Sequence, residues 1–383
     1  MKTHKKDVEY HDAENLYLTT NYFLSSIQYA WRLILSFSGI PIAWMMGSLL
    51  FAAVLSSLPI KWHESQIKKN GIHPHWRQIG QAILGIELGR SFSVSIMDTF
   101  GDYFFIIIVM VISSIAFAFL SGILVWRFSK ANMMTSLFGT TPGGISAMPT
   151  IAEEVGANAF VVSIIQTLRI LLVVGVIPFV AGTLTTRTTA MALESHQGSF
   201  SIESLFFTGC LIIGALAGAF VSKLIKMPAP WLVGSMLGAA MVQLLFPVLF
   251  GHAGATFWPH VLIIFAQVLI GSSIGSRVNK NMFKGLGRIV TVGLLSSLFL
   301  VISMLLCSYL ISIMTRIPLV TCILAFAPGG VAEMATAALA LRADSTFVVA
   351  VQSLRLITIL LLLPPIFRFL NNREPVHSIQ IRK

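Results

Sequence analysis

The sequence predicts an all-α integral membrane protein composed of two homologous halves. Three observations lead to this fold class: an apolar composition, a dozen apolar segments, and polar, glycine and proline positions that recur in one register. Of the 383 residues, 56% are hydrophobic and 11% are charged, whereas about 25% are charged in an ordinary globular protein. Apolar runs such as 103–126 and 290–313 are close to or above the roughly 20 residues that cross a bilayer.

The net charge of +11 does not indicate nucleic-acid binding, because the basic residues lie in short segments between apolar runs. We interpret them as topology signals. The first twenty residues lack the pattern of a cleaved signal peptide. The three cysteines lie in apolar stretches without CxxC spacing, so no metal site and no cofactor is expected. The expected location is the cell (plasma or inner) membrane, with several crossings and the lipid bilayer as the main partner.

Apolar runs define twelve candidate segments, six in each half. Their centres lie near Leu33, Leu50, Leu84, Val111, Thr141, Val173, Gly214, Leu237, Gln267, Leu298, Phe326 and Leu360. A polar stretch rich in Thr and Ser separates the two sets. The predicted organisation is a polar N-terminal tail (1–20), a first membrane repeat (21–181), a linker (182–203), a second membrane repeat (204–370) and a basic C-terminal tail (371–383).

One constant shift along the chain superposes polar, glycine and proline positions of the two halves; we call it the repeat shift. It matches Gln81, Gly85 and Gly89 with Gln267, Gly271 and Gly275, residues 142–144 with 328–330, and Gln166 and Arg169 with Gln352 and Arg355. A shared apolar composition does not reproduce Pro, Gly, Gln and Arg in one register. The sequence therefore predicts an internal duplication.

The charges of equivalent loops predict that the two halves have opposite orientations. The connection 61–77 carries four Lys and Arg residues and its counterpart 251–260 carries none, whereas the acidic segment 91–102 corresponds to the basic segment 277–288. Under the positive-inside rule this pattern favours inverted repeats. Inversion requires an odd number of crossings per half, so one of six segments should be re-entrant, giving about 10–12 transmembrane or re-entrant helices.

The best candidates for re-entrant segments contain the motifs Pro142-Gly143-Gly144 and Pro328-Gly329-Gly330. Within a helix a proline costs about 3 kcal/mol and a glycine about 1 kcal/mol, so we expect broken helices at both motifs. A break frees amide and carbonyl groups that lipid cannot satisfy, and protein, water or a ligand must bind them. The alternative is that the glycines only let helices pack closely.

Two arginines, Arg169 and Arg355, lie inside long apolar runs. A central arginine costs at least roughly 2.5–3.5 kcal/mol, so we expect an anionic group near each. Gln166 and Gln352 precede them by three positions and share their helix face. Such a donor cluster suits a carboxylate or phosphate. Alternatively, nearby carboxylates neutralise the arginines: Glu153 or Glu154 for Arg169, and Glu333 or Asp344 for Arg355.

Glu333 has no acidic counterpart, because the equivalent position in the first half is Ala147. An unmatched carboxylate beside the second motif is a candidate proton or sodium site. Glu87 and Arg90 are spaced for an ion pair within one helix, which we interpret as structural.

The duplicated module, with Pro-Gly-Gly followed about two dozen residues later by Gln-x-x-Arg, resembles the AbrB family of integral membrane proteins. The resemblance covers nearly the whole chain after about residue 20. Members of that family are labelled transcriptional regulators or ammonia monooxygenases. The paired glycines are also similar to those of secondary carriers of citrate and glutamate, which is an analogy at the level of the fold.

The leading hypothesis is a secondary transporter of a small anionic solute rather than an enzyme, with a small molecule or ion as its substrate. The candidate substrate-binding residues are Pro142, Gly143, Gly144, Gln166, Arg169, Pro328, Gly329, Gly330, Glu333, Gln352 and Arg355. The alternative is a membrane-bound regulator that acts on gene expression indirectly, since no DNA-reading module is present and no direct nucleic-acid binding is expected. An ammonia monooxygenase is less favoured, because the sequence lacks the cluster of His and carboxylate residues in the membrane that a metal monooxygenase would need. Homo-oligomerisation stays open.

Overall fold

The computed structural model describes residues 43–57, 73–91, 95–143, 147–154, 156–184, 201–225, 227, 229–252, 254, 256–278 and 286–371. Within these ranges the chain is helical and contains no strand, which confirms the all-α fold class. The helices are α2 (Ala43–Ser57), α4 (Pro74–Arg90), α5 (Ser95–Phe128), α6 (Met133–Thr140), α7 (Ala147–Glu154), α8 (Ala159–Leu184), α9 (Ile202–Leu224), α10 (Pro230–Phe250), α11 (His260–Gly275), α12 (Gly287–Thr315), α13 (Leu319–Phe326), α14 (Val331–Ala340) and α15 (Ser345–Asn371). The predicted segment near Leu33, the tail 1–20 and Gly144 lie outside the described residues.

Five of these helices, α5, α8, α9, α10 and α12, are long and apolar enough to cross a membrane. Large apolar side chains such as Phe105, Ile213 and Leu306 are exposed on α5, α9 and α12. Apolar faces of this extent are unfavourable in water and suit a lipid environment. The fold is therefore that of an all-α membrane protein.

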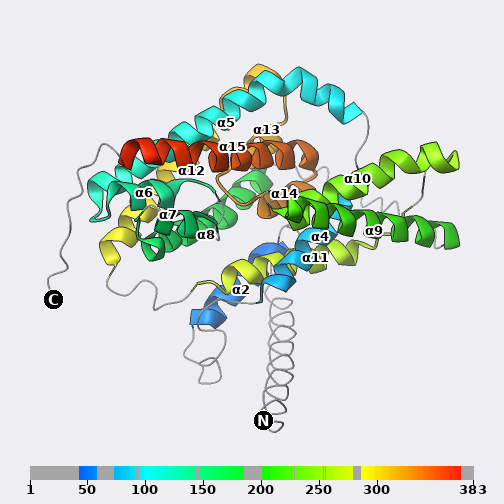
Figure 1. The fold of residues 1–383 in the computed structure, drawn as a ribbon, viewed down its shortest axis with the longest axis horizontal. Helices are drawn as coiled ribbons and strands as arrows, with labels where there is room; N and C mark the ends of the chain where they lie inside the picture. Colours follow the sequence, from blue (N-terminus) through cyan, green and yellow to red (C-terminus); the bar gives the residue numbers. More distant parts are fainter. Residues whose placement is uncertain are drawn as a thin grey trace, which may run out of the picture.

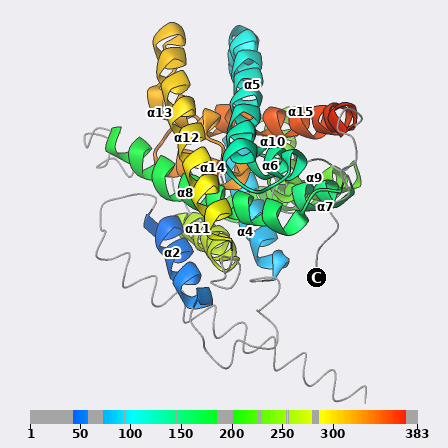
Figure 2. The same ribbon diagram turned by 90° about the vertical axis from the view of Figure 1, so that its left-hand side faces the viewer.

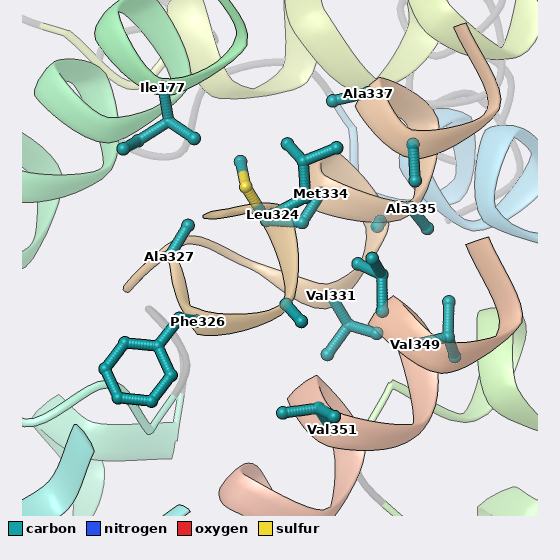
Figure 3. Packing of buried hydrophobic residues seen from close by; sticks show 14 of the residues in the cluster. Ile177, Leu324, Phe326, Ala327, Val331, Met334, Ala335, Ala337, Val349 and Val351 are labelled. Atoms are coloured by element: carbon teal, nitrogen blue, oxygen red, sulfur yellow. The ribbon is translucent and has the colours of Figure 1, made fainter. Parts of the chain in front are cut away.

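The helices form two groups (Figures 1 and 2). We call α2, α4, α9, α10 and α11 the support helices, and α5–α8 with α12–α15 the hairpin bundle; within the bundle, α5 and α12 lie side by side. Helix α14 of the hairpin bundle contacts both α4 and α11 of the support helices. A shared apolar core joins the two groups. Figure 3 shows the part of that core where α8, α13, α14 and α15 meet.

The helix bounds of the two halves agree closely at the repeat shift. Helix α6 coincides with α13 at both ends, α4 begins opposite α11, and α8 begins opposite α15. The packing is also reciprocal, because α2 packs on α11 and its counterpart α10 packs on α4, the counterpart of α11. This agreement is what a duplication would produce, while duplication and inversion themselves stay predictions.

Glycines make the two reciprocal helix pairs possible. A Cβ atom on Gly85 would lie 2.7 Å from the carbonyl oxygen of Leu232, and one on Gly271 would clash with the carbonyl oxygen of Met45. Small residues at such crossings let two backbones approach closely in a membrane. Here the close-packing interpretation that we considered for the Pro-Gly-Gly motifs applies to a different set of glycines.

Candidate functional site

The two motif segments form helical hairpins. The chain breaks between α6 and α7 and again between α13 and α14, which confirms the predicted breaks. At the base of the first hairpin the Asn158 N–H donates to Thr135 Oγ1 (2.9 Å), and at the base of the second the Asp344 N–H donates to Thr321 Oγ1 (3.3 Å). Each segment thus enters and returns at one level, with its Pro-Gly motif at the tip. This geometry fits the predicted re-entrant segments.

The residues at the hairpin bases also start the long helices that follow. Asn158 Oδ1 accepts the Val161 N–H (3.1 Å), and Asp344 Oδ1 accepts the Phe347 N–H (2.9 Å). Both side chains satisfy an amide that the first turn of a helix leaves unpaired. Asp344 is therefore a helix cap, and the interpretation that it pairs with Arg355 is wrong.

At the second hairpin, α15 supplies the donors for carbonyl groups freed by the break. Gln352 Nε2 donates to the carbonyl oxygens of Leu324 (2.9 Å) and Ala327 (3.0 Å). Arg355 Nη1 donates to Ala327 (2.9 Å), and its Nη2 donates to Gly329 (3.3 Å). The pair therefore satisfies backbone acceptors at the tip, where lipid would offer no donor.

The first hairpin repeats this arrangement with α8. Gln166 Nε2 donates to the Phe138 carbonyl oxygen (3.0 Å), and Arg169 Nη1 donates to that of Thr140 (2.6 Å). We expected an anionic group beside each arginine. Among the described side chains the arginines instead bind carbonyl oxygens, which carry only partial negative charge, and Glu153 is exposed. The side chain of Glu154 lies outside the described residues.

The two sets of donors lie close to one another. The Arg169 and Arg355 guanidinium groups are both almost fully buried and interact electrostatically. Val173 of α8 lies 3.3 Å from the place a Cβ would take on Gly329, so α8 packs against the tip of the second hairpin. Ile177, one turn further along α8, lies near the same tip (Figure 3).

Several buried polar atoms of this region have no hydrogen-bond partner within the described chain. They are Gln166 Oε1, Arg169 Nε, Arg355 Nε and Glu333 Oε2. Buried polar groups are normally satisfied, and exceptions point to water, an ion or a ligand. The structure thus brings the predicted Gln and Arg residues, Pro142, Gly143 and residues 328–330 into two neighbouring donor sites.

Glu333 has a different partner from the one expected. It is 1% exposed, and Arg77 of α4 donates from Nη2 to its Oε1 at 3.0 Å, so its predicted pairing with Arg355 is wrong. Arg277, which follows α11, interacts with both groups. Burial lowers the pKa of Arg277 to about 10; the Arg77 charge also lowers it, and the Glu333 carboxylate raises it. Arg277 therefore stays cationic at neutral pH.

Sequence reasoning missed Arg77 and Arg277 as members of a site, because both lie in segments interpreted only as topology signals. It also missed Thr135 and Thr321, although the repeat shift matches them with each other and could have revealed them.

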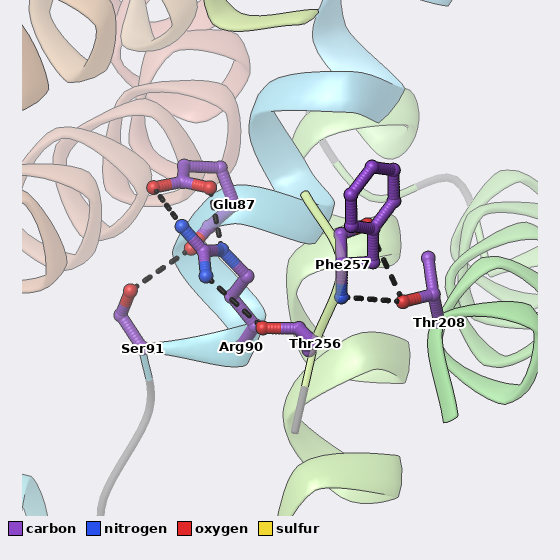
Figure 4. A network of polar contacts seen from close by, with 6 residues as sticks. All are labelled: Glu87, Arg90, Ser91, Thr208, Thr256 and Phe257. Carbon is purple, nitrogen blue, oxygen red and sulfur yellow. Dashed lines mark hydrogen bonds and ion pairs between the residues drawn. The ribbon is translucent and has the colours of Figure 1, made fainter. Parts of the chain in front are cut away.

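The predicted Glu87–Arg90 pair is confirmed (Figure 4). Arg90 donates to both carboxylate oxygens, at 2.6 and 2.9 Å, and also to Thr256 Oγ1 at 3.2 Å. Nearby, the Phe257 N–H donates to Thr208 Oγ1 of α9. These contacts fix the segment before α11 against α4 and α9, which is a structural role.

Two further features lie outside the donor sites. An apolar cavity of about 240 Å³ lies between α2 and α8 and reaches Val278, next to Arg277. No group of three or more His, Cys, Asp or Glu side chains that could hold a metal ion occurs in the part of the chain the structure describes.

The family model described as "Transition state regulatory protein AbrB" matches residues 44–371. The chain belongs to the AbrB family. A relative from Bacillus subtilis (strain 168), named "Uncharacterized protein YhjN", is 44% identical over 353 residues, which cover 91% of this chain and 92% of the relative. A relative from Escherichia coli (strain K12), named "Putative regulator AbrB", is 30% identical over 305 residues, or 78% and 83% of the two chains. The AbrB match includes both hairpins and all the Gln and Arg donors, and it confirms the resemblance seen in the motifs.

Proposed function

We propose that this AbrB-family protein is a secondary transporter of a small anionic solute in the plasma (inner) membrane. The observation that carries the proposal is the pair of broken hairpins whose tips face buried arginine and glutamine donors. Non-helical backbone is tolerated at membrane depth only where protein covers it or it lines a cavity. Many secondary transporters bind their solute at such breaks, between two repeats.

The sign of the buried charge supports an anion. Arg169 and Arg355 are buried against carbonyl oxygens, and neither has a carboxylate partner among the described side chains. A carbonyl oxygen satisfies a guanidinium hydrogen bond without cancelling its charge. The positive potential that remains would attract a carboxylate or phosphate, and it would repel a cationic solute.

The first test is a stabilisation screen of the purified protein with carboxylates and phosphates. A ligand that binds only the folded state raises the apparent melting temperature. Solutes that do so are then tested for flux in proteoliposomes. We expect uptake in vesicles that contain the protein and none in empty vesicles.

Arg355→Gln should abolish this flux, since it removes the buried charge and its bonds to the tip. Arg288→Gln is the matched control: Arg288 also donates to a backbone carbonyl oxygen, that of Phe128 (2.9 Å), but it is exposed and far along the chain from either motif. Full transport by Arg355→Gln would refute the role of this arginine in the site.

The second candidate is a membrane regulator, and the regulatory descriptions of the family model and of the Escherichia coli relative favour it. In that case the same donor sites would sense the anion rather than move it. An anion that stabilises the protein yet never crosses the vesicle membrane, together with loss of a regulatory phenotype in Arg355→Gln, would favour this function over transport.

A further inference from the structure

Another charged site lies at the tip of the second hairpin, between α14 and the support helices. Glu333 stands near the start of α14, and its Oε1 binds Arg77 of α4. Its Oε2 is buried without a partner, and so is Arg77 Nε. A Cβ atom on Gly330 would clash with Oε2, so the carboxylate lies directly against the backbone of the hairpin tip.

Among the described side chains this site has more positive than negative charge. Arg77 binds Glu333 directly, and Arg277 is close enough to interact electrostatically with both of them. The Arg277 side chain makes no hydrogen bond or ion pair to any other described residue. The site can therefore accept one more negative charge before it is neutral.

The first hairpin lacks the equivalent charges. The repeat shift places Ile263, Ser91 and Ala147 at the positions equivalent to Arg77, Arg277 and Glu333, and none of them is charged. This set of charges therefore occurs at the second hairpin and not at the equivalent positions of the first.

The position of the pair also matters. Arg77 belongs to the support helices and Glu333 to the hairpin bundle, so the ion pair joins the two groups at the tip of the second hairpin (Figure 1). Any group that takes the place of the Glu333 carboxylate on Arg77 would break this connection.

We propose that Arg77 and Arg277 form a binding site for the carboxylate group of a solute, and that Glu333 occupies this site while no solute is bound. A solute carboxylate first meets Arg277 and then exchanges with Glu333 on Arg77, which releases the hairpin tip from α4. The inference rests on the proposed transport function and gives its solute class as carboxylates. While Glu333 occupies the site, its ion pair with Arg77 keeps the hairpin tip joined to α4.

Chemical rescue tests the site without knowledge of the natural solute. Glu333→Ala removes the internal carboxylate, and acetate or propionate then serves as the probe. We expect this variant to melt at a lower temperature than the natural protein in sodium chloride, and to recover part of the loss in sodium acetate or propionate of equal ionic strength. The recovery should saturate with acetate concentration.

Two controls define the expected result. The natural protein and Glu203→Ala, which removes an exposed carboxylate paired with His252, should be stabilised by acetate less than Glu333→Ala is, because in both of them the Glu333 carboxylate competes for Arg77. Adding Arg277→Gln to Glu333→Ala should weaken acetate binding at least about tenfold, as the loss of a charge-assisted bond predicts. Should Glu333→Ala fail to fold, Glu333→Ser also removes the carboxylate and leaves space for acetate beside the same arginines.

Equal acetate effects in Glu333→Ala, Glu203→Ala and the natural protein would overturn the proposal, and so would rescue that survives the loss of Arg277. The assay measures binding alone. If acetate rescues the variant but no solute crosses the proteoliposome membrane, the carboxylate site stands and the transport function fails. If solute crosses the membrane but acetate does not rescue the variant, the transport function stands and the carboxylate site fails.

Discussion

Arg77 on α4 and Glu333 on α14 form an ion pair at 3.0 Å across 256 positions of sequence. The carboxylate is almost fully buried, and the arginine is mostly buried. The pair connects the support helices to the tip of the second hairpin, whereas the equivalent residue of the first hairpin is the uncharged Ala147. The predictions below begin with this pair.

Arg77→Gln should destabilise the protein by about 3 kcal/mol, because it leaves the buried Glu333 carboxylate without its partner. The double variant Arg77→Gln/Glu333→Gln should recover most of that loss, since neither side chain is then charged. Thermal or denaturant unfolding in detergent measures both effects. Arg127→Gln, at an exposed position on α5, is the control and should change stability by less than about 0.5 kcal/mol. Additive losses in the double variant would contradict a direct pair.

Gly330→Ala should weaken the same ion pair, because the new Cβ would occupy the space of Glu333 Oε2. Its effect on stability should therefore be smaller in an Arg77→Gln background than in the natural chain, which a double-mutant cycle measures. The comparison variant is Gly143→Ala in the first hairpin. There the Cβ would clash with the buried side chain of Met148 and not with Glu333, so we expect a loss of stability without coupling to Arg77. Equal coupling for both glycines would argue against the mechanism.

Gly85→Ala and Gly271→Ala should each destabilise the protein by about 1–3 kcal/mol, the usual cost of overpacking. The added methyl groups would meet backbone oxygens of α10 and α2, which cannot move without separating the helices. Gly209→Ala on α9 is the matched control, because nothing lies within 4 Å of its Cβ position. That variant should be neutral or slightly stabilising. The melting temperature of each variant in detergent measures this effect. A Gly271→Ala variant as stable as the natural protein would show that α2 and α11 pack less closely than in the structure.

Arg355→Lys should fail to replace Arg355, although it keeps the charge. The guanidinium binds the carbonyl oxygens of Phe326, Ala327 and Gly329 from two nitrogen atoms, whereas a lysine ammonium is a compact charge without that planar spread. We expect a loss of about 1.5–3 kcal/mol from unsatisfied buried acceptors, together with reduced solute binding in the stabilisation screen. Natural stability and binding in the lysine variant would show that charge alone is needed.

Much of the second hairpin could be predicted from local chemistry. Pro328, Gly329 and Gly330 together are unfavourable within a helix, and the recurrence of the motif with Gln352 and Arg355 at fixed spacing marked these donors as candidate binding residues. Their actual partners could not be predicted. Whether a buried guanidinium faces a carboxylate or a carbonyl oxygen depends on which backbone atoms the fold brings within hydrogen-bonding distance, and spacing along one helix does not encode that.

The pairings of Glu333 and Asp344 show the same limit. Both were candidate partners of Arg355 because they lie near it in sequence, yet Asp344 caps its own helix and Glu333 binds Arg77. A local hydrogen bond outcompeted the first pairing, and a helix from the other half of the chain supplied the second. Arg77 itself carried only the signal of a basic loop, which many residues of this chain share.

The sequence by itself determined the membrane character, the positions of the two helix breaks and the repeated set of Gln and Arg donors. These properties follow from hydrophobicity and backbone propensity, which act over a few turns of helix. Only the tertiary structure decided that α14 meets α4 and α11, so that Glu333 pairs with Arg77 and interacts electrostatically with Arg277. Such contacts depend on how helices far apart in the chain pack, because an ion pair forms wherever packing places opposite charges together.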